Sequence, residues 1–257
     1  MGRAVDINSD LGESFGAYTI GDDAALMPVI TSASVACGFH GGDPVVMERT
    51  VRLARSHGVE IGAHPGFPDL AGFGRREMRL SPDEIRAILI YQIGALWGFG
   101  RAQGARLQHV KPHGALYNMA ANDAGWSRAI AEAVAGVDPG LILVALHGSA
   151  MEQAGRDAGL RVAREAFGDR GYTRGGTLVA RGHPGALVTQ PAAVARRVVQ
   201  MVTEGTVETV DGGEIRLVPD TLCFHGDTPG AAQLVRAARD ALSRAGVEIA
   251  PLGRWLS

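Results

Sequence analysis

Residues 107–114 read Leu-Gln-His-Val-Lys-Pro-His-Gly, a short β-type run followed at once by a polar motif that ends in glycine. This unit recurs along the chain and alternates with longer amphipathic runs of helical period. No proline-rich linker or change of composition interrupts the alternation, which predicts a parallel sheet covered by helices in one domain, residues 1–257. The predicted strands are 4–7, 33–37, 59–63, 107–110, 141–145, 160–163 and 221–224.

Seven such units are too few for an ordinary eight-stranded barrel, so we predict an irregular, seven-stranded (β/α) barrel. A doubly wound open sheet is the alternative, although no Gly-x-Gly-x-x-Gly motif follows a strand. Two short strand patterns within residues 206–218 flank Asp211-Gly212-Gly213 and predict a β-hairpin outside the barrel. Capping or proline signals predict three helix starts, at Ser81-Pro82, Gln190-Pro191 and Thr228-Pro229.

Acids and histidines follow the predicted strands at their carboxyl ends. In (β/α) barrels this face carries the active site, because the loops after the strands converge there. The sequence therefore predicts a polar catalytic or binding pocket on this face. In strand order, the residues are Asp6, Asn8, Asp10 and Glu13; His40 and Asp43; His64; Lys111 and His113; His147; Glu165 and Asp169; His225 and Asp227.

Lys111 is the only lysine of the chain, beside 24 arginines. An ammonium is a compact donor that can lose its proton when desolvated, whereas a guanidinium is planar and always charged. We therefore predict that Lys111 serves a site where arginine would not work. Chance survival of one lysine in an arginine-rich sequence is the alternative.

Several polar residues have structural explanations that compete with a functional one. His57 lies at a predicted helix end and is expected to interact with the helix dipole, and His183 is expected in a surface loop. Asp43 and Asp227 are expected to be helix N-caps. His109 lies inside a predicted strand, where a hydrogen-bonded core histidine and a functional one are equally favoured.

The bulk composition argues against some partners and locations. A net charge of −2 gives no basic field for nucleic acid or anionic membranes. Residues 1–6 lack the apolar run of a signal peptide, and no 18-residue apolar segment predicts a membrane span. Cys37 and Cys223 have no metal-binding spacing and are expected to be reduced and buried, which favours the cytoplasm.

No local motif identifies the chemistry. The chain has no P-loop, no Gly-x-Ser-x-Gly and no His-Glu-x-x-His. A metal site made by Asp10, His40 and His64 from neighbouring strands stays open, as does any requirement for a divalent metal.

Seven longer motifs, in order, cover the chain from about residue 5 to about 250 and together resemble the LamB/YcsF family. Departures from the family pattern are mild: Ser34 stands for a common asparagine, Gly41 for alanine, and residues 168–171 for a run with alanines. The motifs are Asp6–Gly16, Ala36–Pro44, Gly62–Gly66, Gly72–Arg76, Tyr91–Leu96, Val110–Asn118 and His225–Pro229.

The resemblance implies a (β/α) barrel of the glycoside hydrolase/deacetylase type. It also implies the reaction of the ATP-hydrolysing 5-oxoprolinase, in which 5-oxo-L-proline, ATP and water give L-glutamate, ADP and phosphate. The family supplies the A subunit of that enzyme, so partner subunits B and C are expected. Because no P-loop is present, ATP is expected to be handled wholly or partly by those partners; a homo-oligomer is left open.

On this basis we assign candidate roles. General base catalysis is expected from Asp10 or Glu13, and stabilisation of an anion from Lys111. Two rivals stay open: a stand-alone metal-dependent amidase or deacetylase, and a non-catalytic substrate-binding subunit. The candidate catalytic residues are Asp10, Glu13, His64, Lys111 and His113, and the candidate substrate- or phosphate-binding residues are Asp6, Asn8, His40, Arg75 and Arg76.

Overall fold

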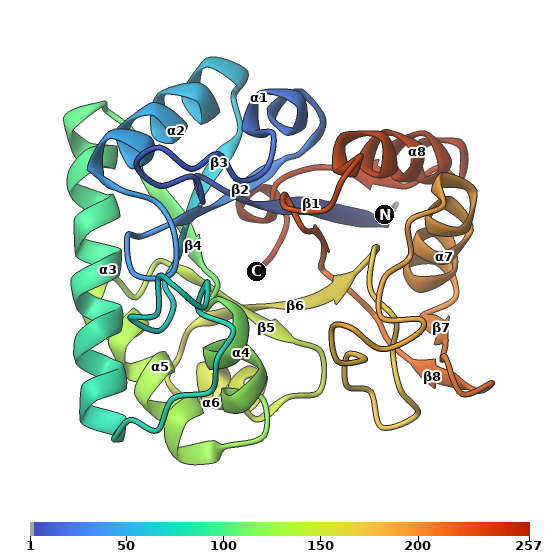
Figure 1. Cartoon of the computed structure of the whole chain (residues 1–257). Helices are drawn as coiled ribbons and strands as arrows, with labels where there is room; N and C mark the ends of the chain where they lie inside the picture. Colours follow the sequence, from blue (N-terminus) through green and yellow to red (C-terminus); the bar gives the residue numbers. More distant parts are fainter. Residues whose placement is uncertain (1–2) are drawn as a thin grey trace.

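The computed structural model describes residues 3–257 and shows a closed barrel of parallel strands surrounded by helices (Figure 1). The ring closes because β1 (Ala4–Leu11) pairs with β2 (Ser32–Ala36) on one side and with β9 (Thr221–Phe224) on the other. The seven-stranded (β/α) barrel is thus confirmed, and the open doubly wound sheet is excluded. The remaining barrel strands are β3 (Glu60–His64), β4 (Leu107–Val110), β5 (Ile142–Leu146) and β6 (Arg161–Phe167).

Helices cover the outside of the barrel, with α3 and the α7–α8 pair on opposite sides (Figure 1). Between residues 3 and 257, no helix is both long enough and apolar enough to span a membrane. The prediction that residues 1–6 contain no signal peptide includes Met1 and Gly2. These two residues lie outside the described residues. The α-helices are α1 (Asp23–Leu26), α2 (Pro44–His57), α3 (Pro82–Ala102), α4 (Gly114–Ala120), α5 (Ala124–Val137), α6 (Ala150–Asp157), α7 (Pro191–Thr203) and α8 (Ala231–Arg244); η1 (Met27–Val29) and η2 (Leu252–Arg254) are 3-10 helices.

The predicted helix starts are confirmed at two of three places. Ser81 forms a capping box with Glu84, and Gln190 precedes Pro191 at the first turn of α7. The last helix begins later than predicted, at Ala231, because Gly230 in the left-handed region ends the preceding turn. Asp43 caps α2 as predicted.

The predicted hairpin is present as β7 (Thr206–Glu208) and β8 (Glu214–Arg216), which pair antiparallel outside the barrel (Figure 1). A short strand that was not predicted, β10 (Glu248–Ile249), adds to the edge of β1 at Ala4 and Val5.

The barrel interior is layered. At its amino-terminal end Ile142, Val144 and Ala163 pack with Leu252 and Trp255, so the C-terminal segment closes this end with apolar side chains. Above them, Asp6 accepts hydrogen bonds from the hydroxyls of Thr31, Ser32 and Thr221. Polar residues therefore fill the half of the barrel that leads to the carboxyl ends of the strands.

Strand β1 is longer than predicted, and its added residues carry polar side chains into the barrel interior. The predicted strand ends at Ile7, but the observed strand continues to Leu11, with side chains that alternate between its two faces. Val5, Ile7 and Leu11 join the core under the helices. Asn8 and Asp10 share the other face, which is the polar interior.

Candidate active site

A cavity of about 500 Å³ opens at the carboxyl ends of the strands. Its wall carries both acids and bases, together with the apolar side chains of Leu146, Phe167 and Tyr117. The predicted polar pocket is therefore present on the predicted face. The charged and imidazole side chains that line it are Asp10, His64, Arg75, Glu77, Lys111, His113, Glu165, Arg170, Arg181 and His225.

Lys111 lies in the middle of a cage of acceptors and is only 2% exposed. Its Nζ is 2.5 Å from Asp10 Oδ1 and 3.3 Å from Glu165 Oε1. It also donates to Asn8 Oδ1 at 2.9 Å and lies 3.2 Å from Cys223 Sγ. The four acceptors come from β1, β6 and β9, so three strands position this ammonium.

The charges in the cage hold each other ionised. Burial by itself would lower the pKa of Lys111, but Asp10, Cys223 and Glu165 together raise this pKa well above its usual value. Burial would likewise raise the pKa of Asp10, but His64 and Lys111 hold it well below its usual range. Lys111 is therefore a fixed cation in this state, and Asp10 is a weak base.

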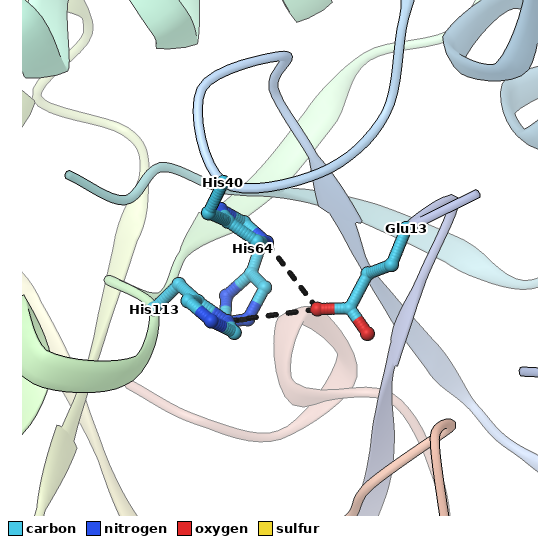
Figure 2. A group of neighbouring side chains, drawn as sticks. All are labelled: Glu13, His40, His64 and His113. Atoms are coloured by element: carbon cyan, nitrogen blue, oxygen red, sulfur yellow. Dashed lines mark hydrogen bonds and ion pairs between the residues drawn. The ribbon is translucent and has the colours of Figure 1, made fainter. Parts of the chain in front are cut away.

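Beside the cage, three imidazoles and a carboxylate form a second group, Glu13, His40, His64 and His113 (Figure 2). His40 stacks on His113 with 3.6 Å between ring centroids and 1° between ring planes. Glycine at positions 66 and 74 makes room, since a Cβ at either would lie 2.7 Å from an atom of His40. The Gly66 and Gly74 motifs thus allow the rings to approach.

Glu13 approaches two of these rings but does not itself line the cavity. Its Oε1 is 3.3 Å from His40 Nε2 and 3.6 Å from His113 Nδ1. Burial, followed by the charges of Asp10 and Asp227, raises the pKa of Glu13 well above its usual value. Burial lowers the pKa of His40 and of His113, as does the charge of neighbouring histidines.

Opposite this group, Asp169 and His225 form a carboxylate–imidazole pair. Asp169 Oδ2 accepts from His225 Nδ1 at 3.0 Å and from the His225 backbone N–H at 3.1 Å. The ring of His225 stacks on Phe167 and borders the cavity. This pair fixes the imidazole orientation, so its Nε2 is the free nitrogen.

Arg75 and Arg76, the two arginines predicted to bind substrate or phosphate, have different surroundings. Arg75 borders the cavity and pairs with Asp227 at 2.7 Å, with Arg181 on the other oxygen of Asp227 at 3.9 Å. Asp227 was predicted to cap the last helix; this prediction is wrong, because Gly230 takes the N-cap position. Arg76 pairs with Asp69 at the surface, away from the cavity.

The structure brings most of the candidate site residues together. Asn8, Asp10, Glu13, His40, His64, Lys111 and His113 lie in the two adjoining groups. Asp6 lies deeper in the barrel among hydroxyls, and it does not reach the cavity. The metal site left open by the sequence combines Asp10 with His40 and His64. In the structure the carboxylate beside His40 and His113 is that of Glu13.

Other residues found by the structure had weaker signals. Glu165, Asp169 and His225 end predicted strands, yet nothing in their spacing showed that they meet. His109 is buried and bonds Ser34 at 3.2 Å, and burial lowers its pKa to about 3, which fits a core histidine. His57 is in the last turn of α2, and His183 is exposed, both as predicted.

Comparison with known proteins places the chain among relatives that match it from end to end. It is 57% identical over 251 residues to the 5-oxoprolinase A subunit of Symbiobacterium thermophilum, covering 98% of this chain and 96% of the relative. The match to the 5-oxoprolinase A subunit of Methylococcus capsulatus is 54% over 257 residues, covering 100% and 99%.

Solved structures give the same result. The lactam utilization protein of Thermus thermophilus superposes with a TM-score of 0.91 at 54% identity, covering 96% of this chain and 99% of the other. A putative cellobiose-phosphate cleavage protein of Enterococcus faecalis shares the fold alone, with a TM-score of 0.58 at 12% identity over the full length of both chains. The model of the LamB/YcsF family matches residues 5–257, and the chain belongs to that family.

Proposed function

We propose that this chain is the ring-opening subunit of an ATP-dependent 5-oxoprolinase, which converts 5-oxo-L-proline to L-glutamate. The observation that carries the proposal is the end-to-end similarity to proteins named as the A subunit of 5-oxoprolinase. The cavity supports it chemically, because it combines fixed cations, an oriented imidazole and ionised carboxylates in one buried place.

The cavity suits an anionic substrate that carries more than one charge. A five-membered lactam acid has one carboxylate and fills only part of about 500 Å³. Arg75 and Arg181 on the wall can hold a carboxylate or a phosphoryl group bidentately, whereas Nε and Nη2 of Arg170 already donate to backbone carbonyls. ATP is the cosubstrate of the assembled enzyme in this proposal, with phosphoryl transfer making the lactam carbonyl electrophilic.

We assign the general base to His225, in place of the sequence-based candidates Asp10 and Glu13. Asp10 is held ionised by Lys111, and Glu13 does not border the cavity. His225 Nε2 would take a proton from the attacking water and return it to the leaving ring nitrogen, while Asp169 holds the ring in place. Lys111 stabilises the negative charge that develops on the substrate oxygen.

The assembly and location complete the proposal. The names of the relatives imply several subunits, and we expect B and C as partners. Cys37 and Cys223 are free and buried, which supports a reducing compartment such as the cytoplasm.

The test is glutamate formation from 5-oxoproline and ATP, measured with the chain alone and with subunits B and C. Lys111→Arg should lower turnover by at least about 100-fold, since one lost oxyanion donor costs this much. Arg101→Lys, the reverse exchange at an exposed site, should leave turnover unchanged. Turnover retained in folded Lys111→Arg would contradict the role of Lys111.

The two rival functions predict different results in the same assay. A stand-alone amidase would open amides without B, C or ATP. A non-catalytic binding subunit would support assembled activity even when Lys111 and His225 are both replaced.

A further inference from the structure

Two ring nitrogens in the histidine group lie within hydrogen-bond distance of each other. His64 Nε2 and His113 Nδ1 are 2.9 Å apart, and both rings border the cavity. The outer nitrogens of the same rings are already committed: His64 Nδ1 lies 2.7 Å from the carbonyl of Lys111, and His113 Nε2 lies 2.8 Å from the carbonyl of Phe73.

The hydrogen bonds of the outer nitrogens determine where the N–H hydrogens of His64 and His113 lie. A carbonyl oxygen only accepts, so each outer nitrogen must carry the hydrogen that it donates. A neutral imidazole has one N–H, and therefore both inner nitrogens present lone pairs to each other. Two lone pairs at hydrogen-bond distance require something positive between or beside them.

A carboxylate converges on the same point. Glu13 Oε1 is 3.6 Å from His113 Nδ1, and no lysine or arginine pairs with Glu13 among residues 3–257. The nearby buried carboxylates are Asp10 and Glu165, and both are served by the single ammonium of Lys111. One proton would join only one pair of atoms, whereas a divalent cation would serve both imidazoles and Glu13 together.

We propose that His64, His113 and Glu13 bind one divalent transition-metal ion, of the class of zinc, at the wall of the cavity. Imidazole and carboxylate are the ligands that such ions prefer. At bond lengths of about 2.1 Å, tetrahedral ligand atoms lie ~3.4 Å apart, and the observed separations of 2.9 and 3.6 Å bracket that edge. The two carbonyls complete the arrangement, since metal-bound histidines donate their other N–H to such acceptors.

His40 belongs to the group but is not a ligand. Lone pairs of ring nitrogens lie in the ring plane, and the rings of His40 and His113 are parallel and 3.6 Å apart. Parallel lone pairs at that spacing cannot both point at one ion about 2.1 Å away. His40 instead contacts the carboxylate of Glu13 from Nε2, which would orient this ligand.

Three protein ligands leave coordination positions open, and His64 and His113 both line the cavity, so that open positions can face it. Such an ion polarises a bound carbonyl or lowers the pKa of bound water. Binding of the ion is measured without substrate, so its outcome is independent of the proposed ring opening.

The experiment uses Co²⁺ as the probe, added to chelator-treated full-length chain and followed by calorimetry and by visible absorption. We expect one Co²⁺ per chain and an absorption spectrum of a four- or five-coordinate ion. Glu13→Gln, which keeps the side-chain volume, and His113→Ala should each weaken binding by at least about 10-fold. His147→Ala, at a histidine that ends β5 outside the group, should bind like the wild type.

Several results would overturn the proposal. The first is wild-type chain that binds no stoichiometric Co²⁺. The second is binding that survives Glu13→Gln and His113→Ala but is lost in His225→Ala, which would place the ion with Asp10 and Cys223. A change of the Co²⁺ absorption spectrum in His40→Gln like that in His113→Ala would refute the three-ligand arrangement, since a residue that only orients a ligand changes the affinity but not the set of ligands. Thermal unfolding shows whether each variant is folded. If His113→Ala is unfolded, the proposal is tested by Co²⁺ binding to Glu13→Gln alone.

Discussion

Removing the ammonium of Lys111 should destabilise the fold by about 3–5 kcal/mol, the usual cost of leaving a buried charge unpaired. The perturbation is Lys111→Met, which keeps the length of the side chain. At an effective dielectric of about 20, the attraction is about 7 kcal/mol to Asp10 at 2.5 Å and about 5 kcal/mol to Glu165 at 3.3 Å. Desolvation of the ions offsets several kcal/mol of this, so the smaller net figure is the one to expect.

A double-mutant cycle with Asp10→Asn separates the pair from its surroundings. Each single variant leaves a buried charge without its nearest partner, whereas Lys111→Met/Asp10→Asn removes both charges of this pair and leaves Glu165 as the remaining carboxylate of the cage. We therefore expect the double variant to be more stable than the sum of the single losses predicts, by about 2 kcal/mol. The assay is urea unfolding followed by circular dichroism, with unchanged m values as the control for two-state behaviour. Losses that add within about 0.5 kcal/mol would refute the cage as an energetic unit.

Two further predictions concern the barrel interior. Burial raises the pKa of Asp6 to about 6 despite the hydroxyls of Ser32, Thr221 and Thr31, so the folded state binds the extra proton and its stability falls as the pH rises from about 4 to about 6. Relative to Asp6→Asn, the wild type should lose about 3 kcal/mol across that window in pH-dependent unfolding, and a flat difference would remove Asp6 as the cause. A methyl group at Gly62 would overlap the buried ring of His109, so Gly62→Ala should lower stability by about 1–3 kcal/mol. In the double variant Gly62→Ala/His109→Ala, thermal unfolding should show that part of this lost stability is regained. No recovery would show that the strain does not come from the His109 ring.

The sequence predicted the barrel, its seven strands and the face of the site, because alternation and strand-end motifs are local signals. It could not show which strand ends meet. Asp169 and His225 are 56 residues apart and come together because β6 and β9 pair in the sheet. Pairing between strands is a long-range property that no local pattern encodes.

A local sequence motif can also give a wrong prediction when the same side chain could serve either of two roles. Asp227 stands just before Thr228-Pro229 and satisfies the rule for a helix cap, but its carboxylate pairs with Arg75 from a loop that follows β3. Likewise, Asp6 looks like Asp10 in sequence, since both alternate along β1. Four residues of strand rise place Asp6 about 13 Å further back along β1, among hydroxyls instead of charges.

The ratio of one lysine to 24 arginines now has a geometric explanation. Lys111 Nζ is surrounded by four acceptors from three strands, at 2.5–3.3 Å from a single nitrogen. An ammonium can direct its three N–H bonds around a point, whereas a guanidinium directs five N–H bonds outward in one plane. The larger planar group would have to move Asn8, Asp10 or Glu165, and Asp10 also stands 3.4 Å from His64 Nε2. A change from lysine to arginine at position 111 would thus disturb both polar groups of the site.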